Sequence, residues 1–317
     1  MKLPEELKNK LEEISNKYKE NELSKAYAGI SERYMTKERI GSTLLEKEID
    51  VIAYANARMP ATYSAVYTAF EKAYKYLDDS KIKTLIEIGA GTGAATWAIS
   101  SFVNFEKLTC IEREENMINF AKALMKDTSL AIANWEKQDI TDAELQEKAD
   151  IIVASYMLNE IKEDKKIEIV EKLWNNTNEI LFIIEPGTPK NYKNIMKYKE
   201  YLVQNGGHII APCPHQGRCE LPENDWCHFT CRVERTKIHK NIKAADSPFE
   251  DEKFIYLIVN KNEMPGATNR ILRHPKIEKG YVDVKLCTKE GLKEERITKS
   301  QKEMYKAVRK AAAGYEL

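Results

Sequence analysis

The segment from Thr84 to Trp97 constrains the fold more strongly than any other part of the sequence. It reads Thr-Leu-Ile-Glu-Ile-Gly-Ala-Gly-Thr-Gly-Ala-Ala-Thr-Trp, so residues that favour a strand precede Gly89, Gly91 and Gly93. Glycines at such positions let the backbone turn tightly and approach a bound molecule. A helix that begins after them directs free N–H groups at the ligand. The segment therefore predicts a strand, a loop and a helix that bind a nucleotide-type cofactor.

The chain from Thr84 onward alternates between segments that favour strands and segments that favour helices. Such alternation is typical of a parallel sheet that is covered by helices on both faces. We therefore expect an α/β, Rossmann-like fold with a doubly wound sheet of seven strands. The expected strands cover residues 84–88, 107–112, 131–135, 151–155, 179–185, 208–211 and 253–259.

The first 80 residues are predicted to form a helical region. A helix over residues 43–58 is expected to end near Pro60, and a second helix to begin there, because proline suits the first helical turn. Apolar and aromatic side chains then recur at helical spacing, which predicts that they belong to the core. These residues are Tyr63, Val66, Tyr67, Phe70, Tyr74 and Leu77.

The overall composition limits the kind of protein and its surroundings. The 317 residues include 50 Lys and Arg and 50 Asp and Glu, so the formal net charge is zero. This balance argues against a generally basic nucleic-acid-binding protein, although it allows a local basic patch. No apolar run approaches the roughly 18 residues of a membrane span, and the first residues lack an apolar secretion segment. We expect a cytoplasmic, monomeric protein whose six cysteines are metal ligands or free thiols.

An acid follows the second expected strand, at Glu112, 19 residues after Gly93. This is near the spacing at which such an acid reaches the ribose hydroxyls of a nucleotide. The glycines alone also suit an NAD-binding fold. Their Gly-x-Gly-x-Gly spacing, together with Glu87 two residues before the first glycine, resembles instead the class I S-adenosylmethionine-dependent methyltransferases.

This resemblance covers about residues 82–260 and implies a set of cofactor contacts. In that class, the glycine loop wraps the methionine part, the acid after the second strand binds the ribose, and the loop after the third strand flanks the adenine. The cofactor-binding residues that it implies here are Glu87, Gly89, Ala90, Gly91, Gly93, Glu112, Gln138, Asp139 and Ser155.

The methyl acceptor is expected beside the exit of the fourth strand, because ligands bind at the carboxyl ends of parallel strands. The candidates there are Tyr156, Asn159 and Glu160. The Asp/Asn-Pro-Pro-Tyr signature that methyltransferases use for exocyclic amines is absent from this position. No residue is therefore assigned as a catalytic base.

Four cysteines and two histidines crowd into residues 213–231, between the sixth and seventh expected strands. The prolines and Gly217 in this insertion indicate a loop, and a bound metal could order such a loop. Zinc sites favour ligands two to four residues apart, and only Cys227 and Cys231 have that spacing. An iron–sulfur cluster accepts wider spacings. The three-cysteine pattern of radical enzymes is absent, and both metals remain open at this point.

Several motifs in and around the insertion resemble the methyltransferase-like family associated with the small ribosomal subunit of mitochondria and bacteria. They include Pro212-Cys-Pro-His215, Asp225-Trp-Cys-His-Phe229 and, before the sheet, Arg58-Met-Pro-Ala-Thr-Tyr63. The family implies a 4Fe-4S cluster on four cysteines, three in the insertion and one in the tail. Carried over, the ligands are Cys213, Cys219, Cys227 and Cys287. Sequence proximity alone favours Cys231 as the fourth ligand.

The resemblance also suggests how the chain is divided. We expect an N-terminal helical region at 1–80, a methyltransferase-like domain at 81–260 that includes the insertion at 211–245, and a C-terminal hairpin and helix at 261–317. The last of these would pack on the insertion, because a cluster held by Cys287 would join them.

Local positive charge is the other feature of the insertion. Residues 232–243 contain five Lys and Arg against one Glu, and the tail adds further cations from Lys285 to Lys310. Contacts with phosphates require charge of this kind, although a solvated surface is the simpler alternative. Because the family acts on ribosomal RNA, the expected partner is small-subunit ribosomal RNA. The candidate RNA contacts are Arg232, Arg235, Lys237, Lys240 and Lys243.

Two functions are therefore expected as alternatives. The first is transfer of a methyl group from S-adenosylmethionine to small-subunit ribosomal RNA, in which alignment of donor and acceptor would supply much of the rate. The second is a non-catalytic factor for assembly of the small ribosomal subunit, built on the same fold. The cluster would be structural in either case.

Overall fold

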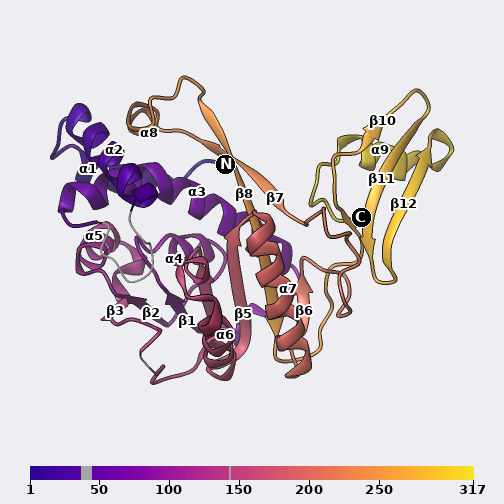
Figure 1. The fold of residues 1–317 in the computed structure, drawn as a ribbon, viewed down its shortest axis with the longest axis horizontal. Coiled ribbons are helices and arrows are strands. Elements are labelled where there is room, and N and C mark those ends of the chain that lie inside the picture. Colours follow the sequence, from indigo (N-terminus) through magenta and orange to yellow (C-terminus); the bar gives the residue numbers. More distant parts are fainter. Residues whose placement is uncertain (37–44, 143) are drawn as a thin grey trace.

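The computed structural model describes residues 1–36, 45–142 and 144–317. Its centre is an eight-stranded mixed sheet with the strand order β3-β2-β1-β4-β5-β8-β6, and β7 pairs with β8 beside this path. Helices cover both faces of this sheet, and a second, smaller sheet lies to one side (Figure 1). This is the Rossmann-like methyltransferase fold expected from the sequence, with eight strands in place of the expected seven.

The first five strands of the large sheet run parallel to one another. The long β8 runs antiparallel to its three neighbours β5, β6 and β7. The strands are β1 (Thr84–Ile88), β2 (Lys107–Glu112), β3 (Asn134–Lys137), β4 (Ala149–Ser155), β5 (Thr177–Pro186), β6 (His208–Ala211), β7 (Phe229–Glu234) and β8 (Phe249–Asn260).

The additional strand is β7. It has a partner because β8 begins at Phe249, before the start expected at residue 253. The first half of β8, which reads Phe-Glu-Asp-Glu-Lys, pairs only with β7 and alternates between exposed and half-buried residues. The sequence therefore carries no apolar signal there. Between β6 and β7, residues 212–228 form neither helix nor strand.

Successive residues of the central strands face two separate cores, as the geometry of a strand requires. Leu85 and Val153 belong to the core beneath α1 to α5, whereas Ile86 and Ala154 belong to the core beneath α6 and α7. The helices are α1 (Glu5–Ser15), α2 (Glu20–Thr36), α3 (Glu48–Tyr74), α4 (Ala94–Ile99), α5 (Glu115–Met125), α6 (Lys166–Asn175), α7 (Pro189–Gln204), α8 (Lys237–Ile242) and α9 (Lys302–Lys310).

The break expected at Pro60 is wrong, because α3 continues through this proline as one helix of 27 residues. A proline inside a helix costs about 3 kcal/mol. Seventeen residues of α3 are buried, Pro60 among them, and this packing compensates for the lost hydrogen bond. The first two residues of the helix expected over 43–58 lie outside the described residues.

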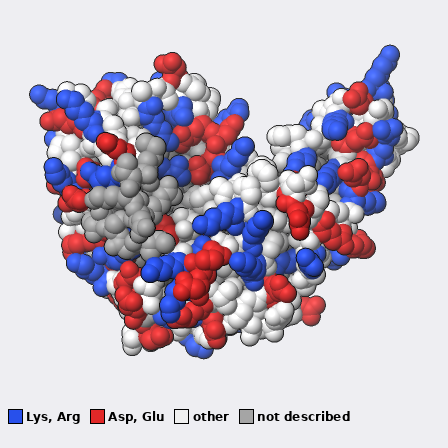
Figure 2. All heavy atoms as spheres, in the orientation of Figure 1, with Lys and Arg blue, Asp and Glu red and all other residues white. Residues whose placement is uncertain are grey.

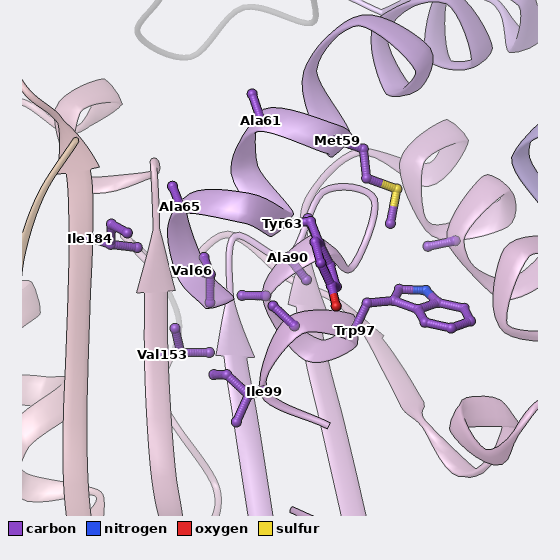
Figure 3. Packing of buried hydrophobic residues seen from close by; sticks show 14 of the residues in the cluster. Met59, Ala61, Tyr63, Ala65, Val66, Ala90, Trp97, Ile99, Val153 and Ile184 are labelled. Carbon is purple, nitrogen blue, oxygen red and sulfur yellow. The ribbon is translucent and has the colours of Figure 1, made fainter. Parts of the chain in front are cut away.

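The predicted aromatic core along α3 is confirmed. Phe70 is fully buried and its ring lies 6.1 Å from that of Phe182 in β5. Figure 3 shows Val66 directed at the sheet, near Val153, and Tyr63 close to Trp97 beside the glycine loop. This packing places α3 over the carboxyl ends of the central strands.

The C-terminal region forms a four-stranded antiparallel sheet with α9 on one face. Its own small core includes Val282, Ile297, Tyr305 and Val308. The expected hairpin corresponds to the two long strands of this sheet, and two short strands extend it. The strands are β9 (Arg270–Ile271), β10 (Lys276–Ile277), β11 (Tyr281–Thr288) and β12 (Gly291–Thr298).

Polar contacts join this second sheet to the cysteine-bearing loop 212–228. The carboxylate of Asp225 pairs with Arg273 and lies 3.4 Å from the Lys285 ammonium. The backbone N–H of Leu292 donates to Glu220. The second sheet thus packs on the loop, while the predicted domain boundaries themselves stay a prediction.

Candidate functional site

A cavity of about 440 Å³ lies at the carboxyl ends of β1, β2 and β4, and α3 covers one side of it. The strands and the loops after them contribute nearly all the cofactor-binding residues that the sequence predicted. Those that line the cavity are Glu87, Gly89, Ala90, Gly91, Glu112, Gln138, Asp139 and Ser155. Gly93 does not line it.

The three glycines of the loop have different roles. All three adopt positive φ values, which side chains rarely tolerate. A Cβ atom on Gly89 would meet Met157 at 2.8 Å, and one on Gly93 would collide with Met125. A Cβ on Gly91 would meet nothing within 4 Å. Gly89 and Gly93 therefore permit close packing, whereas Gly91 faces the open cavity.

Glu87 stabilises the helix that follows the loop. Its carboxylate accepts hydrogen bonds from the backbone N–H groups of Ala95 and Thr96, at 3.2 and 2.8 Å, and from the Thr96 hydroxyl at 2.6 Å. Burial raises the pKa of Glu87 to about 7, although these bonds act in the opposite direction. The acid before the first glycine thus caps α4 and fixes the loop from beneath.

Glu112 holds the open part of the loop in place. One carboxylate oxygen accepts a hydrogen bond from the Gly91 N–H at 2.7 Å, and the other accepts from the Glu114 N–H at 2.8 Å. A carboxylate can accept about four hydrogen bonds. Glu112 therefore has remaining acceptor sites beside the cavity, and its role in binding ribose hydroxyls stays a prediction.

Asp139 lies on the expected adenine side of the cavity. One of its oxygens accepts hydrogen bonds from the backbone and the hydroxyl of Thr141, at 2.9 and 2.8 Å, and Arg113 lies 3.7 Å from the other. Burial alone would raise the pKa of Asp139, but these partners outweigh it and lower the pKa. The side chain is therefore an ionised acceptor.

The acceptor side of the cavity is closed by a polar network. The Tyr156 hydroxyl donates to Glu252 at 3.0 Å, and Arg58 of α3 pairs with the same carboxylate at 3.2 Å. Burial and the charge of Glu252 raise the pKa of Tyr156 well above its ordinary value, although Arg58 acts to lower it. Tyr156 therefore stays protonated and is unsuited to act as a base.

Of the other two candidates on the acceptor side, Glu160 lines the cavity and Asn159 does not. The Asn159 amide donates instead to Glu185 at 2.7 Å and to the Tyr156 carbonyl at 2.9 Å. The buried Ser155 hydroxyl also lines the cavity and has no hydrogen-bond partner within the described part of the chain.

The structure gathers the four cysteines that the family resemblance implied. They lie around one small cavity between the loop 212–228 and the second sheet. Burial, and then the neighbouring Cys213 and Cys219, raise the pKa of Cys287 to about 12. Cys231 does not line this cavity: it lies on β7, where burial and the charge of Glu252 raise its pKa to about 12.

The surroundings of this cysteine cavity suit a buried anionic group. Apolar side chains from the loop and from both sheets line most of it. The Tyr256 hydroxyl is buried in its wall and has no hydrogen-bond partner among the described residues. The buried Lys199 and Arg270 lie close enough for their charges to act on the Cys213 thiol. A donor and two cations thus accompany the four thiols.

The described residues contain no group of three or more His, Cys, Asp or Glu side chains placed to hold a metal ion. This finding and the shared cavity point in different directions. A four-iron cluster separates its ligands more widely than a single metal ion does, so cysteines arranged around a shared cavity are compatible with a cluster. The chemistry of the donor set fits four-thiolate ligation.

Most of the cations expected to contact RNA are paired with acids. The described residues offer Lys240 no acidic partner within 4 Å. Lys and Arg alternate with Asp and Glu over much of the face in Figure 2. The pairs are Arg232 with Asp251, Arg235 and Lys243 with Glu250, and Lys237 with Glu20.

Comparison with known families identifies the group to which the chain belongs. Residues 48–317 match the family described as mitochondrial small ribosomal subunit Rsm22. The chain belongs to the Rsm22 family. The human mitochondrial ribosome assembly protein METTL17 is 25% identical over 262 residues, which cover 76% of this chain and 56% of that protein.

A second relative is the mitochondrial Rsm22-cox11 tandem protein 2 of Schizosaccharomyces pombe, which is 23% identical over 331 residues. The alignment covers 86% of this chain and 44% of the relative. This member of the Rsm22 family thus spans about half the length of the curated relatives that it matches.

The solved structures that are similar to this chain include methyltransferases. The plantazolicin methyltransferase BpumL, in complex with S-adenosylhomocysteine, is 12% identical with a TM-score of 0.45 and covers 77% of this chain and 98% of its own. The magnesium protoporphyrin IX methyltransferase of Synechocystis, with bound S-adenosylmethionine, is 12% identical with a TM-score of 0.40 and covers 75% and 97%.

The expectation of a cytoplasmic protein is wrong. The Rsm22 family is described as mitochondrial, and both relatives carry mitochondrial names. These findings point to the mitochondrion rather than to the cytoplasm. Along the described residues, no helix is long and apolar enough to cross a membrane.

Sequence reasoning missed the residues that α3 contributes to the larger cavity. The residues of α3 that line it are Tyr54, Arg58, Met59 and Thr62. In the sequence, the segment Arg58 to Tyr63 is marked only by its resemblance to a family motif. A helix far from the glycine loop in sequence gives no signal that it covers the loop in space. Glu252, which binds both Arg58 and Tyr156, was missed because it lies in the unpredicted half of β8.

The open position of Gly91 generates a prediction. Alanine in its place should weaken binding of S-adenosylhomocysteine by about tenfold or more, because a methyl group at this φ is strained and would occupy cofactor space. Calorimetric titration measures this. Gly206→Ala is the matched control, since Gly206 also has a positive φ and open space around it but lies after α7. Equal affinity in both variants would contradict the assignment of the cavity.

Proposed function

We propose that this Rsm22-family chain binds S-adenosylmethionine in the 440 Å³ cavity and acts as an assembly factor for the small ribosomal subunit. The observation that carries the cofactor assignment is the contact between the Gly91 N–H and Glu112. This contact holds Gly91, which has open space around it, beside the Glu112 carboxylate, which can accept further hydrogen bonds. This arrangement suits the methionine and ribose parts of the cofactor.

The assembly role is supported by the state of the acceptor side. A methyltransferase that must deprotonate its acceptor needs a base near the reacting atom. Tyr156 is protonated and bound to Glu252, and Asn159 is bound to Glu185. The relative METTL17 is named a ribosome assembly protein. By analogy, the proposed partner is the RNA of the small ribosomal subunit.

Methyl transfer to that RNA is the second candidate. In its favour, the cavity continues from Gly91 to Ser155 and Glu160, so donor and acceptor groups could share it. The methyl group would pass from the sulfonium of the cofactor to a nucleophilic atom of a base, which would have to be presented in the cavity. Alignment alone could then supply much of the rate.

We also propose that Cys213, Cys219, Cys227 and Cys287 hold a 4Fe-4S cluster, with zinc as the alternative. A bound cluster would supply four strong bonds that join the loop to the second sheet. The chain's own contribution is to exclude water with apolar side chains and to place the Tyr256 hydroxyl and the Lys199 ammonium nearby. Such groups around thiolates stabilise a buried anionic site.

The two functional candidates differ in one measurable outcome. Small-subunit RNA from a strain that lacks this gene should receive no tritiated methyl group from S-adenosylmethionine when the purified protein is added. The protein should still bind the cofactor in calorimetry. Incorporation that disappears in the Gly91→Ala variant would instead establish methyl transfer and overturn the assembly-only proposal.

The ligand set is tested by paired cysteine variants. Cys287→Ser should lose iron, because Cys287 lines the cysteine cavity, and Cys231→Ser should keep it, because Cys231 lies outside that cavity. Iron per chain is measured after anaerobic purification, with thermal unfolding to show that both variants are folded. The reverse pattern would move the fourth ligand to Cys231.

A further inference from the structure

Charge is distributed unevenly along the chain despite its zero total. Residues 261–317 contain 14 Lys and Arg and 8 Asp and Glu, a formal charge of +6. Because the whole chain has 50 of each, residues 1–260 carry −6. The second sheet and α9 therefore form a basic module attached to an acidic body.

Four of the cations of this module lie on the helix α9. Tyr305 and Val308 point inward and pack in the core of the second sheet. Lys302, Lys306 and Lys310 are all exposed and follow one another at intervals of four residues. At 1.5 Å per residue they span about 12 Å of the helix, a length over which a nucleic-acid duplex presents several phosphates.

The turn before β11 extends this stripe of charge. The backbone N–H of Lys299 donates to the carbonyl of Gly280 at 3.2 Å, so the residues before α9 lie beside this turn. Lys279 and Lys299 are both exposed. Glu278 precedes Lys279 directly, whereas the acids closest to Lys299 in sequence are Glu295 and Glu303. We define the α9 face as the exposed cations of both segments, namely Lys279, Lys299, Lys302, Lys306, Arg309 and Lys310.

Most of this charge is not neutralised by the protein. Among the described residues, five of the six cations on the α9 face have no acidic side chain within 4 Å, namely Lys279, Lys299, Lys302, Arg309 and Lys310; only Lys306 has one. Lys306 pairs with Glu303 of its own helix at 2.9 Å, and the Arg309 guanidinium lies 5.6 Å from the Tyr305 ring. The α8 segment differs, because four of its five expected cations are already paired with acids.

We propose that the α9 face binds the phosphate backbone of RNA. This inference rests on the proposed function, which makes small-subunit RNA the partner. Five lysines and one arginine suit contact with phosphates rather than reading of bases, and Tyr305, the aromatic residue of α9, is buried and unavailable for stacking on a base. A membrane surface fits less well, because a helix that lies on lipid exposes an apolar face, whereas Tyr305 and Val308 of α9 are buried.

The α9 face lies at the end of the second sheet that is remote from the cysteine loop. The turn between β11 and β12 adjoins the cysteine loop through Glu220 and Leu292, whereas the α9 face includes the opposite end of these strands. Eight residues of strand separate the two ends by about 26 Å. The module is visible as a separate lobe in Figure 2, so the α9 face can meet RNA while the body binds elsewhere.

The test is a set of four charge-neutralising substitutions on α9: Lys302→Gln, Lys306→Gln, Arg309→Gln and Lys310→Gln. Binding to a fluorescent RNA duplex of about 20 base pairs is measured in the full-length protein over a range of salt. Affinity should fall at least about tenfold, and the slope of log K against log salt should fall by about 3 to 4, because each lost phosphate contact removes about 0.9.

The matched control removes four exposed lysines from the body: Lys19→Gln, Lys25→Gln, Lys122→Gln and Lys126→Gln. It changes the net charge equally and should leave the affinity and the slope unchanged. Thermal unfolding checks that both sets are folded. Binding to phosphatidylserine vesicles is measured in parallel. The inference would be overturned if both sets lost RNA affinity equally, or if the α9 set lost binding to the vesicles but kept its affinity for RNA. Wild-type protein that binds no RNA would overturn the proposed partner as well.

Discussion

The buried guanidinium of Arg270 is the contact on which the arrangement of the two sheets depends. It donates to the carbonyl of Pro212 at 2.6 Å and to that of Gly314 at 2.9 Å, and it lies 3.4 Å from Glu316. Glu316 in turn pairs with Lys75 just after α3. One fully buried cation thus joins the cysteine loop, the second sheet and the last residues of the chain. Loss of the carbonyl partners or of the Glu316 carboxylate would leave the Arg270 charge buried without compensation, which would destabilise the fold.

The two candidate sites share strand β8. Glu252 binds Arg58 and Tyr156 beside the larger cavity, and Tyr256, four residues later, lines the cysteine cavity. Four residues of strand correspond to about 13 Å. The antiparallel β8 therefore connects the larger cavity with the cysteine cavity.

Local patterns in the sequence predicted the central sheet and most of its cavity. The glycine loop and Glu112 lie where their spacing placed them, because a strand, a tight turn and a helix are specified by neighbouring residues. The continuous α3 was missed because its burial, a tertiary effect, outweighs the local preference of Pro60. The paired state of Arg232 and Arg235 was also missed, since their partners lie in the first half of β8, which has no apolar pattern. Cys287 was found only through family resemblance, because no spacing rule links it to cysteines that lie 60 to 74 positions earlier.

We propose that four cysteines from two separate segments hold one metal cluster, which together with Arg270 fixes the second sheet to the body. The most direct measurement is the iron and sulfide content of the protein after anaerobic purification. The account predicts a brown protein with about four irons and four sulfides per chain, as expected for a 4Fe-4S cluster on four thiolates. A colourless protein that carries one zinc per chain, or no metal at all, would contradict it.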